Sequence, residues 1–161
     1  MTDVFSSLPP SDRHFAALDL ETTRDGRFVS FAAVTAEETF FTETPEEMHR
    51  ILTRLVDEKR GLVGHNLLGF DIPWLLKNGA DARLADIPVI DTLFLSPLAF
   101  PANPYHRLVK DYKIVSDTVN NPVHDAELSL TLLADERAAL RKRPPAVLSL
   151  FSTLFSRAED P

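Results

Sequence analysis

The stretch FAALDLETT, residues 15–23, decides how the rest of the chain is interpreted. Its apolar beginning predicts a buried strand over residues 15–21, and a strand turns alternate side chains to the same face. Asp19 and Glu21 therefore project from one side of the strand, where their carboxylates repel each other. Burying such a pair without a compensating charge is costly, so the stretch predicts a positive group beside it.

Composition restricts the class of protein. The chain has 161 residues, 44% of them hydrophobic and 25% charged, and it is expected to form a single domain over residues 1–161. The net charge of −7 argues against a broad basic surface for nucleic acid, but not against binding through metal ions. The absence of cysteine excludes disulfides and thiolate metal sites. Without a signal peptide or a membrane span, the sequence predicts a cytoplasmic protein with no membrane partner.

The order of the predicted elements indicates the fold class. After the first strand, an Asp25-Gly26 turn and apolar runs at residues 28–36 and 39–43 predict an antiparallel meander. Residues 44–61 predict a helix, with Thr44 and Glu47 as a capping box and Gly61 as its stop. Strands are then predicted over residues 61–66 and 87–91, and helices over residues 71–79, 92–100, 104–113 and 121–143, the last of them capped by Asn121. Residues 146–155 predict one or two further helical turns. Three antiparallel strands followed by parallel strands predict an α/β mixed sheet flanked by helices.

Two further carboxylates lie in apolar surroundings. Asp71 lies in GHNLLGFDIPWL, residues 64–75, and Asp125 in NNPVHDAELSL, residues 120–130. Buried acidic residues need partners, and the nearby basic residues are too few for four carboxylates. Two Mg²⁺ or Mn²⁺ ions would balance the four charges and suit hard oxygen ligands. A pair of such ions is the usual apparatus for phosphodiester hydrolysis.

At these residues the chain resembles the DEDD 3′–5′ exonucleases of the ribonuclease H-like fold. The motifs LDLETT, GHNLLGFDIPWL and HDA follow in the order of that family over roughly residues 14–142. The form of the second motif is most similar to proofreading domains of family B DNA polymerases. The resemblance implies that Asp19, Glu21, Asp71 and Asp125 are the catalytic metal ligands. It also implies that Thr22 and Asn66 contact the terminal nucleotide.

The sequence departs from this family at one catalytic position. A tyrosine or histidine that orients the attacking water precedes the last aspartate by four or five residues, and here those positions are Asn121 and Asn120. An asparagine amide hydrogen-bonds a water but does not accept its proton. His124 is adjacent to Asp125, about 100° around a helix, so it is expected to point elsewhere. General-base assistance is worth about 10²–10⁴-fold, so we expect attenuated activity that depends on all four ligands.

The predicted function is a metal-dependent 3′–5′ exonuclease, with Asn121 in the catalytic water-positioning place and Asn120 beside the substrate. Single-stranded DNA or the 3′ ends of DNA are the expected partners, with RNA less favoured and DNA repair among the fitting processes. A second interpretation is a catalytically weakened module that binds nucleic-acid ends or a partner protein. A third is a hydrolase of very short oligonucleotides. The domain is also of a type fused to or associated with polymerases and helicases, so it would then be the N-terminal part of a longer protein.

Three other features of the sequence are interpreted as structural rather than catalytic: Asp91, His65 and the apolar tail. Asp91 is expected to cap the helix that follows it, and the alternative is that it is a fifth metal ligand. His65 is expected to hydrogen-bond backbone in a turn rather than act in catalysis. The apolar tail at residues 146–155 needs cover, from the domain's own core, from a second copy or from a further domain, and the sequence leaves the oligomeric state open.

Overall fold

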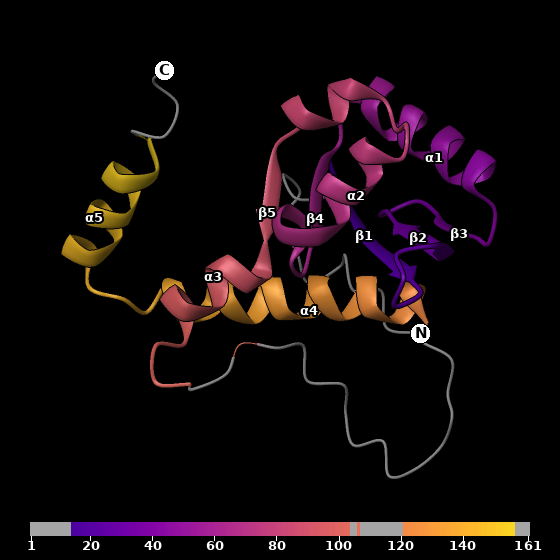
Figure 1. The fold of residues 1–161 in the computed structure, drawn as a ribbon. Helices are drawn as coiled ribbons and strands as arrows, with labels where there is room; N and C mark the ends of the chain where they lie inside the picture. The colour runs from indigo at the N-terminus through magenta and orange to yellow at the C-terminus, as the bar shows by residue number, and fades with distance from the viewer. Residues whose placement is uncertain (1–13, 104–105, 107–120, 157–161) are drawn as a thin grey trace, which may run out of the picture.

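The computed structural model describes residues 14–103, 106 and 121–156, which form a mixed sheet between helices (Figure 1). The five strands are β1 (Phe15–Thr22), β2 (Phe28–Val34), β3 (Thr39–Thr42), β4 (Gly61–Gly64) and β5 (Val89–Asp91). They lie in the order β3-β2-β1-β4-β5, with β1, β2 and β3 antiparallel and β4 and β5 parallel to β1. The predicted α/β class and the change from antiparallel to parallel pairing are confirmed.

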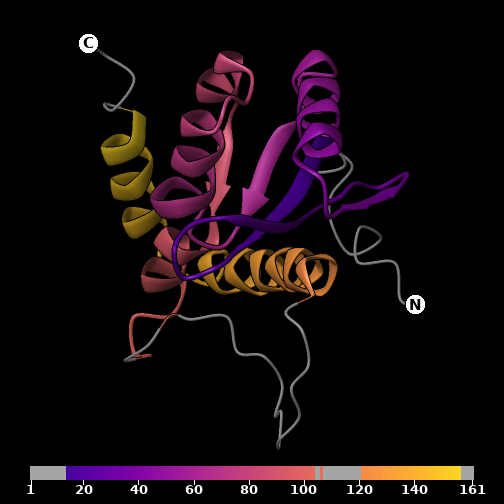
Figure 2. The same ribbon diagram turned by 45° about the vertical axis from the view of Figure 1, so that its right-hand side comes forward.

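Helices lie on both faces of this sheet (Figure 2). The helical elements are α1 (Pro45–Asp57), the π-helical η3 (Leu67–Asp71), α2 (Ile72–Lys77), the 3₁₀ helix η4 (Ala82–Asp86), α3 (Thr92–Ala99), α4 (Pro122–Leu140) and α5 (Pro145–Ser156). Side chains of α1, α2 and η4 pack with Leu18 and Phe31 in the larger core. Ala126, Leu130 and Leu133 of α4 pack with Ala17 and Val63 on the opposite face. The alternation along β1 thus divides its side chains between two cores.

Helix α1 begins after Thr44 as predicted, but its capping contacts and its end differ from the sequence prediction. The side chain of Thr44 forms no capping hydrogen bond and contacts the hydroxyl of Thr42 instead, while Glu47 pairs with Arg50 within the helix. The predicted capping box is therefore wrong. The predicted stop at Gly61 is also wrong, because the chain leaves the helix at Lys59, whose φ is 53°. Gly61 begins β4, where a Cβ atom would lie 2.4 Å from the ring of Phe15.

The remaining elements follow the predictions with local changes. Helices α2, α3, α4 and α5 and strands β4 and β5 are present, and the predicted helix at residues 104–113 lies almost entirely outside the described residues. The single turns η3 and η4 were not predicted. Within residues 14–103 and 121–156, no helix combines the length and apolar character that crossing a bilayer requires.

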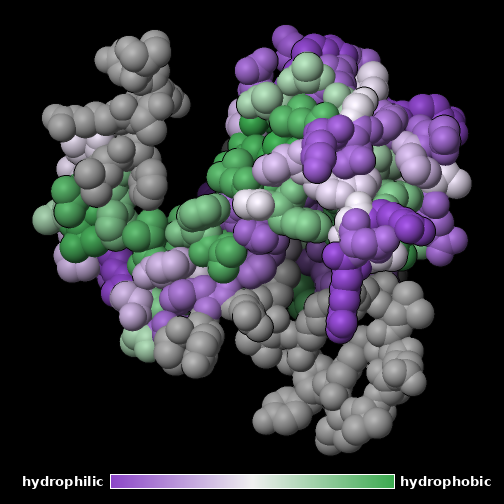
Figure 3. Space-filling view, viewed as in Figure 1, coloured by the Kyte–Doolittle hydropathy of each residue, from purple (hydrophilic) through white to green (hydrophobic). Residues whose placement is uncertain are grey.

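Helix α5 carries the apolar tail and stands apart from the sheet in both ribbon views (Figures 1 and 2). Leu148 and Leu150 are 37% and 55% exposed, and apolar surface is visible on this helix in Figure 3. Of the three covers that the sequence leaves open for this tail, the domain's own core does not cover these two leucines.

Candidate metal centre

Three of the four predicted ligands lie together. One carboxylate oxygen each from Asp19, Glu21 and Asp125 can be chosen so that all three atoms lie within 4.8 Å of one another. Asp19 and Glu21 come from β1, and Asp125 comes from the first turn of α4, far along the chain. Asp125 is 4% exposed, whereas the other two side chains are half-buried. We call these three residues the acidic cluster.

The fold brings the cluster together through sheet alternation and helix packing. Ala17, Asp19 and Glu21 share one face of β1, and Ala17 packs in the core that α4 covers. Asp125 is followed by Ala126, which is fully buried in that core, and Leu130 and Leu133 continue the contact one and two turns later. Packing of these small and apolar residues therefore places the start of α4 over the carboxylates of β1.

Asp71 lies beside the acidic cluster but is turned toward the backbone. Its Oδ1 accepts a hydrogen bond of 3.1 Å from the N–H of Leu20, the residue between Asp19 and Glu21. Strand β1 has ended its pairing with β4 at Ala17, so Asp71 satisfies an N–H group beyond that ladder. Asp71 is 4% exposed, and this burial is the main cause that raises its pKa to about 8.

Neighbouring groups act on the same carboxyl in both directions. The N–H groups of Asp71 itself and of Leu20 lower the pKa of Asp71, while the negative charges of Asp91 and Glu21 raise it. Asp71 is thus close enough to Glu21 for their charges to repel. A divalent cation in the acidic cluster would favour the ionised form of Asp71.

The donor set fits a hard divalent cation. Three carboxylates with oxygens within 4.8 Å of one another supply the charged oxygen ligands that Mg²⁺ and Mn²⁺ prefer. Asp71 differs from the other three, because its Oδ1 is directed at Leu20 and it is not one of the clustered side chains. The acidic cluster is one group of three residues that could bind a cation. A second cation would need Asp71 as a ligand, which is a prediction from the sequence.

Asn121 has a structural role that the sequence predicted. It is the N-cap of α4, and its Oδ1 accepts hydrogen bonds from the N–H groups of Val123 at 3.1 Å and His124 at 3.4 Å. This oxygen is directed at the helix backbone, and the side chain of His124 is exposed, away from the core of the sheet. The other asparagine, Asn120, lies outside the described residues.

Asp91 organises the loop that carries Asp71. Its carboxylate accepts from the N–H of Asn66 at 2.8 Å, of Leu68 at 2.9 Å and of Leu93 at 3.0 Å. The last bond confirms the predicted cap of α3, and the first two fix η3 against the end of β5. Asp91 is therefore a structural carboxylate rather than a fifth member of the acidic cluster.

The remaining predicted residues lie around this loop and strand end. Thr22 closes β1 at a bulge, and Asn66 adopts a left-handed conformation (φ 71°) with its side chain over Gly69. The imidazole Nδ1 of His65 lies 2.9 Å from the hydroxyl of Thr92, a side-chain partner that the prediction did not include. The ring also interacts with the backbone of His106, which lies outside the turn where the backbone bond was expected. Burial lowers the pKa of His65 despite the charge of Asp91.

Two features of the site had not been expected from the sequence. The N–H of Leu20 as the partner of Asp71 depends on where β1 and β4 stop pairing, which no motif indicates. A hollow beside the first turn of α4, lined in part by Phe41, was also missed. The alternation of β3 was the available signal, because it places Phe41 on the face opposite Phe40.

No protein-family model matches the chain, and no curated protein or solved structure matches it either.

Proposed function

We propose that this protein is a metal-dependent 3′–5′ exonuclease that hydrolyses phosphodiester bonds at DNA 3′ ends. The observation that carries the proposal is the acidic cluster. In this cluster, strand β1 and helix α4 bring one carboxylate oxygen from each of three residues within 4.8 Å of one another. These residues belong to the first and third motifs of the DEDD resemblance. Proximity of the two motifs is what a nuclease of that kind requires.

The sheet gives independent support to a ribonuclease H-like fold. Its order is β3-β2-β1-β4-β5, with an antiparallel meander followed by two parallel strands, and α4 crosses the face that bears Asp19 and Glu21. Asp71, from the second motif, lies next to β1 through its bond to Leu20. All three motifs therefore lie at one end of the central strand.

The chain's residues have separable roles in the proposed reaction. Asp19, Glu21 and Asp125 would hold a divalent cation, and Asp71 would complete the set for a second. Bound cations supply positive charge that stabilises the phosphoryl transition state and activates water. Thr22 and Asn66 lie at the strand end and in the loop beside the cluster, where they would position the terminal nucleotide.

We expect the exonuclease activity of this protein to be low. The Oδ1 of Asn121 is engaged in capping α4, so it does not serve as a proton acceptor for water. Without a tyrosine or histidine at this position, the rate loses the contribution of general-base assistance, about 10²–10⁴-fold. Mn²⁺ is the first cation to test, at high enzyme concentration.

The test is degradation of 5′-labelled single-stranded DNA by the purified chain in Mn²⁺. We expect a ladder that shortens from the 3′ end, with Asp19→Asn inactive and Glu127→Gln as active as the native chain. Glu127 is a partly buried carboxylate of α4 outside the acidic cluster, so it is the matched control. Intact DNA in every reaction, or equal degradation by Asp19→Asn, would refute the proposal.

A binding module is the second candidate, and the capping role of Asn121 favours it. Such a module would retain the acidic cluster and bind nucleic-acid ends or a partner protein without hydrolysing a phosphodiester bond. Calorimetric titration with Mn²⁺, followed by an assay for released mononucleotide, separates the two. Metal binding without release of mononucleotide supports the module, and release excludes it.

A further inference from the structure

A hollow of about 500 Å³ opens beside the acidic cluster, between the edge of the sheet and the first turn of α4. Its described lining consists of Val29, Ser30, Phe41, Glu43, Asn121 and the two residues that follow Asn121. This volume lies in the range of sites that hold small organic groups. Four of these seven described residues are apolar, and the other three supply a hydroxyl, a carboxylate and an amide.

Sheet register places the hollow next to the carboxylates. Ser30 is the cross-strand partner of Glu21, and Ala32 is the partner of both Asp19 in β1 and Phe41 in β3. Cross-strand partners project from the same face, so Phe41, Ala32 and Asp19 form one row on the face that α4 covers. Two strand spacings separate the α-carbons of Phe41 and Asp19 by about 10 Å.

The start of α4 lies over the same row of side chains. Pro122 and Val123 line the hollow, and the N–H of Asp125 donates to the carbonyl of Asn121 at 3.1 Å. The hollow and the acidic cluster thus share one helical turn. One bound molecule could therefore place one group at the acidic cluster and a neighbouring group in the hollow.

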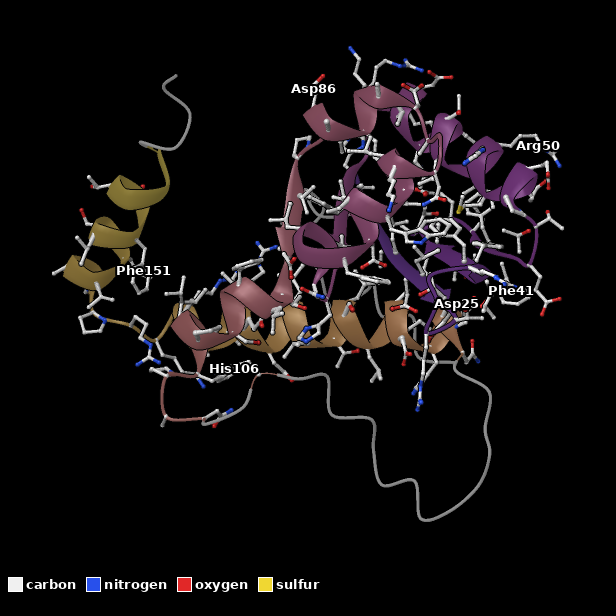
Figure 4. The ribbon with its side chains drawn as sticks, viewed as in Figure 1. Asp25, Phe41, Arg50, Asp86, His106 and Phe151 are labelled. Atoms are coloured by element: carbon white, nitrogen blue, oxygen red, sulfur yellow. The ribbon has the colours of Figure 1, made fainter. Side chains whose placement is uncertain are left out.

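Phe41 is the aromatic residue of the hollow's described lining. Phe41 is 52% exposed on the edge strand β3, and Val29 beside it is 42% exposed. Figure 4 shows Phe41 on the side of the molecule where α4 begins. An exposed aromatic face at the rim of an apolar hollow is suited to stacking a planar ring.

We infer that this hollow is the subsite for the base of the terminal nucleotide of a DNA strand, with Phe41 as its stacking partner. The inference rests on the proposed function, because it assigns the phosphate of the same nucleotide to the acidic cluster. No lysine or arginine is among the described residues that line the hollow, and Glu43 would repel a phosphate. A neutral heterocycle with hydrogen-bonding edges fits this lining, and Ser30 and the amide of Asn121 can contact those edges.

The inference is tested with two oligonucleotides that differ only at the 3′ end, where one carries a base and the other an abasic nucleotide. Binding to the native chain is measured by fluorescence anisotropy in Ca²⁺, and cleavage is measured separately in Mn²⁺. Stacking of a base on an aromatic ring is worth about 1–3 kcal/mol, which corresponds to roughly 5- to 150-fold in affinity. We expect loss of the terminal base to weaken binding by a factor in that range.

Variants then assign the effect to Phe41. Phe41→Ala should weaken binding of the intact strand by a similar factor and have no further effect on the abasic strand, whereas Phe41→Trp should retain stacking. Phe94→Ala is the matched control, because Phe94 is 60% exposed on α3, outside the hollow. The abasic comparison uses the native chain, so it holds even where Phe41→Ala destabilises β3.

The outcomes distinguish the inference from the proposed function. Cleavage of DNA by the native chain, with equal affinity for the intact and abasic strands, would overturn the base subsite and leave the nuclease in place. Base-dependent binding through Phe41 without any cleavage would support the subsite and favour the binding module. Neither binding nor cleavage by the native chain would refute both.

Discussion

The carboxyl group of Glu136 should make the stability of this protein fall as the pH rises. Glu136 is fully buried on α4 and contacts the hydroxyl of Ser96 on α3 through its Oε1. Its Oε2 is buried and has no hydrogen-bond partner among the described residues. Burial, with the charges of Asp91 and Asp135, raises the pKa of Glu136 to about 7, and the bond from Ser96 acts against this rise.

The size of the effect follows from the difference in pKa between the folded and unfolded chains. The pKa of Glu136 rises from 4.5 to about 7, so the folded protein holds this proton more tightly. The resulting stabilisation is complete below pH 4.5 and is lost as the pH rises through about 7. At 1.36 kcal/mol for each unit, the full contribution is about 3 kcal/mol, of which about 2.5 kcal/mol is lost between pH 5 and pH 8.

Urea unfolding of the native chain and of Glu136→Gln measures this contribution. The glutamine cannot ionise, and its amide can still bond the hydroxyl of Ser96. From pH 5 to pH 8, the free energy of unfolding of the variant should rise relative to the native chain by about 2.5 kcal/mol. Titrating groups that do not interact with Glu136 affect both proteins equally and cancel in the difference.

The control is Glu127→Gln, which neutralises a less buried glutamate on the same helix. A pH-dependent difference of the same size in this control would mean that the effect does not come from Glu136. A constant difference between the native chain and Glu136→Gln from pH 5 to pH 8 would show that Glu136 ionises normally in the folded state, and the reasoning would be refuted.

Three further predictions concern the site and its supports. Asp125→Asn removes a charged ligand and should weaken Mn²⁺ binding about tenfold or more in calorimetry, whereas unchanged affinity would contradict the acidic cluster as a metal centre. Asp91→Ala leaves three backbone N–H groups without their carboxylate and should lower the free energy of unfolding by about 3 kcal/mol in urea; a loss below about 1 kcal/mol would be inconsistent with this role. Asn121→Ala should cost about 1 kcal/mol in thermal unfolding and Asn121→Asp much less, because aspartate also caps helices. Equal losses in both would argue against the cap.

The local geometry of the site was predictable because it depends on backbone periodicity. Alternation along a strand sufficed to place Asp19 and Glu21 on one face, and the structure shows both in the acidic cluster. The N-caps Asn121 and Asp91 were likewise predictable from residues that precede helical patterns. The capping box at Thr44 failed because Thr42 and Arg50, both near in sequence, offered competing partners.

The contacts between distant segments required the tertiary structure. The motif order made the approach of Asp125 to β1 an expectation, but packing of Ala126, Leu130 and Leu133 against the sheet determines the separation. The orientation of Asp71 toward Leu20 depends on where β1 and β4 stop pairing, and the hollow at Phe41 depends on how far α4 extends across β3. Nothing local distinguishes Glu136 from the other acidic residues of α4.

The sequence by itself determined which side chains share a strand face or begin a helix, because these relations follow from periods of two and 3.6 residues along one segment. The tertiary structure decided which of those side chains meet and which lose contact with water. Such distances depend on the volumes of all the residues packed between the elements, and no single segment of the chain contains that information.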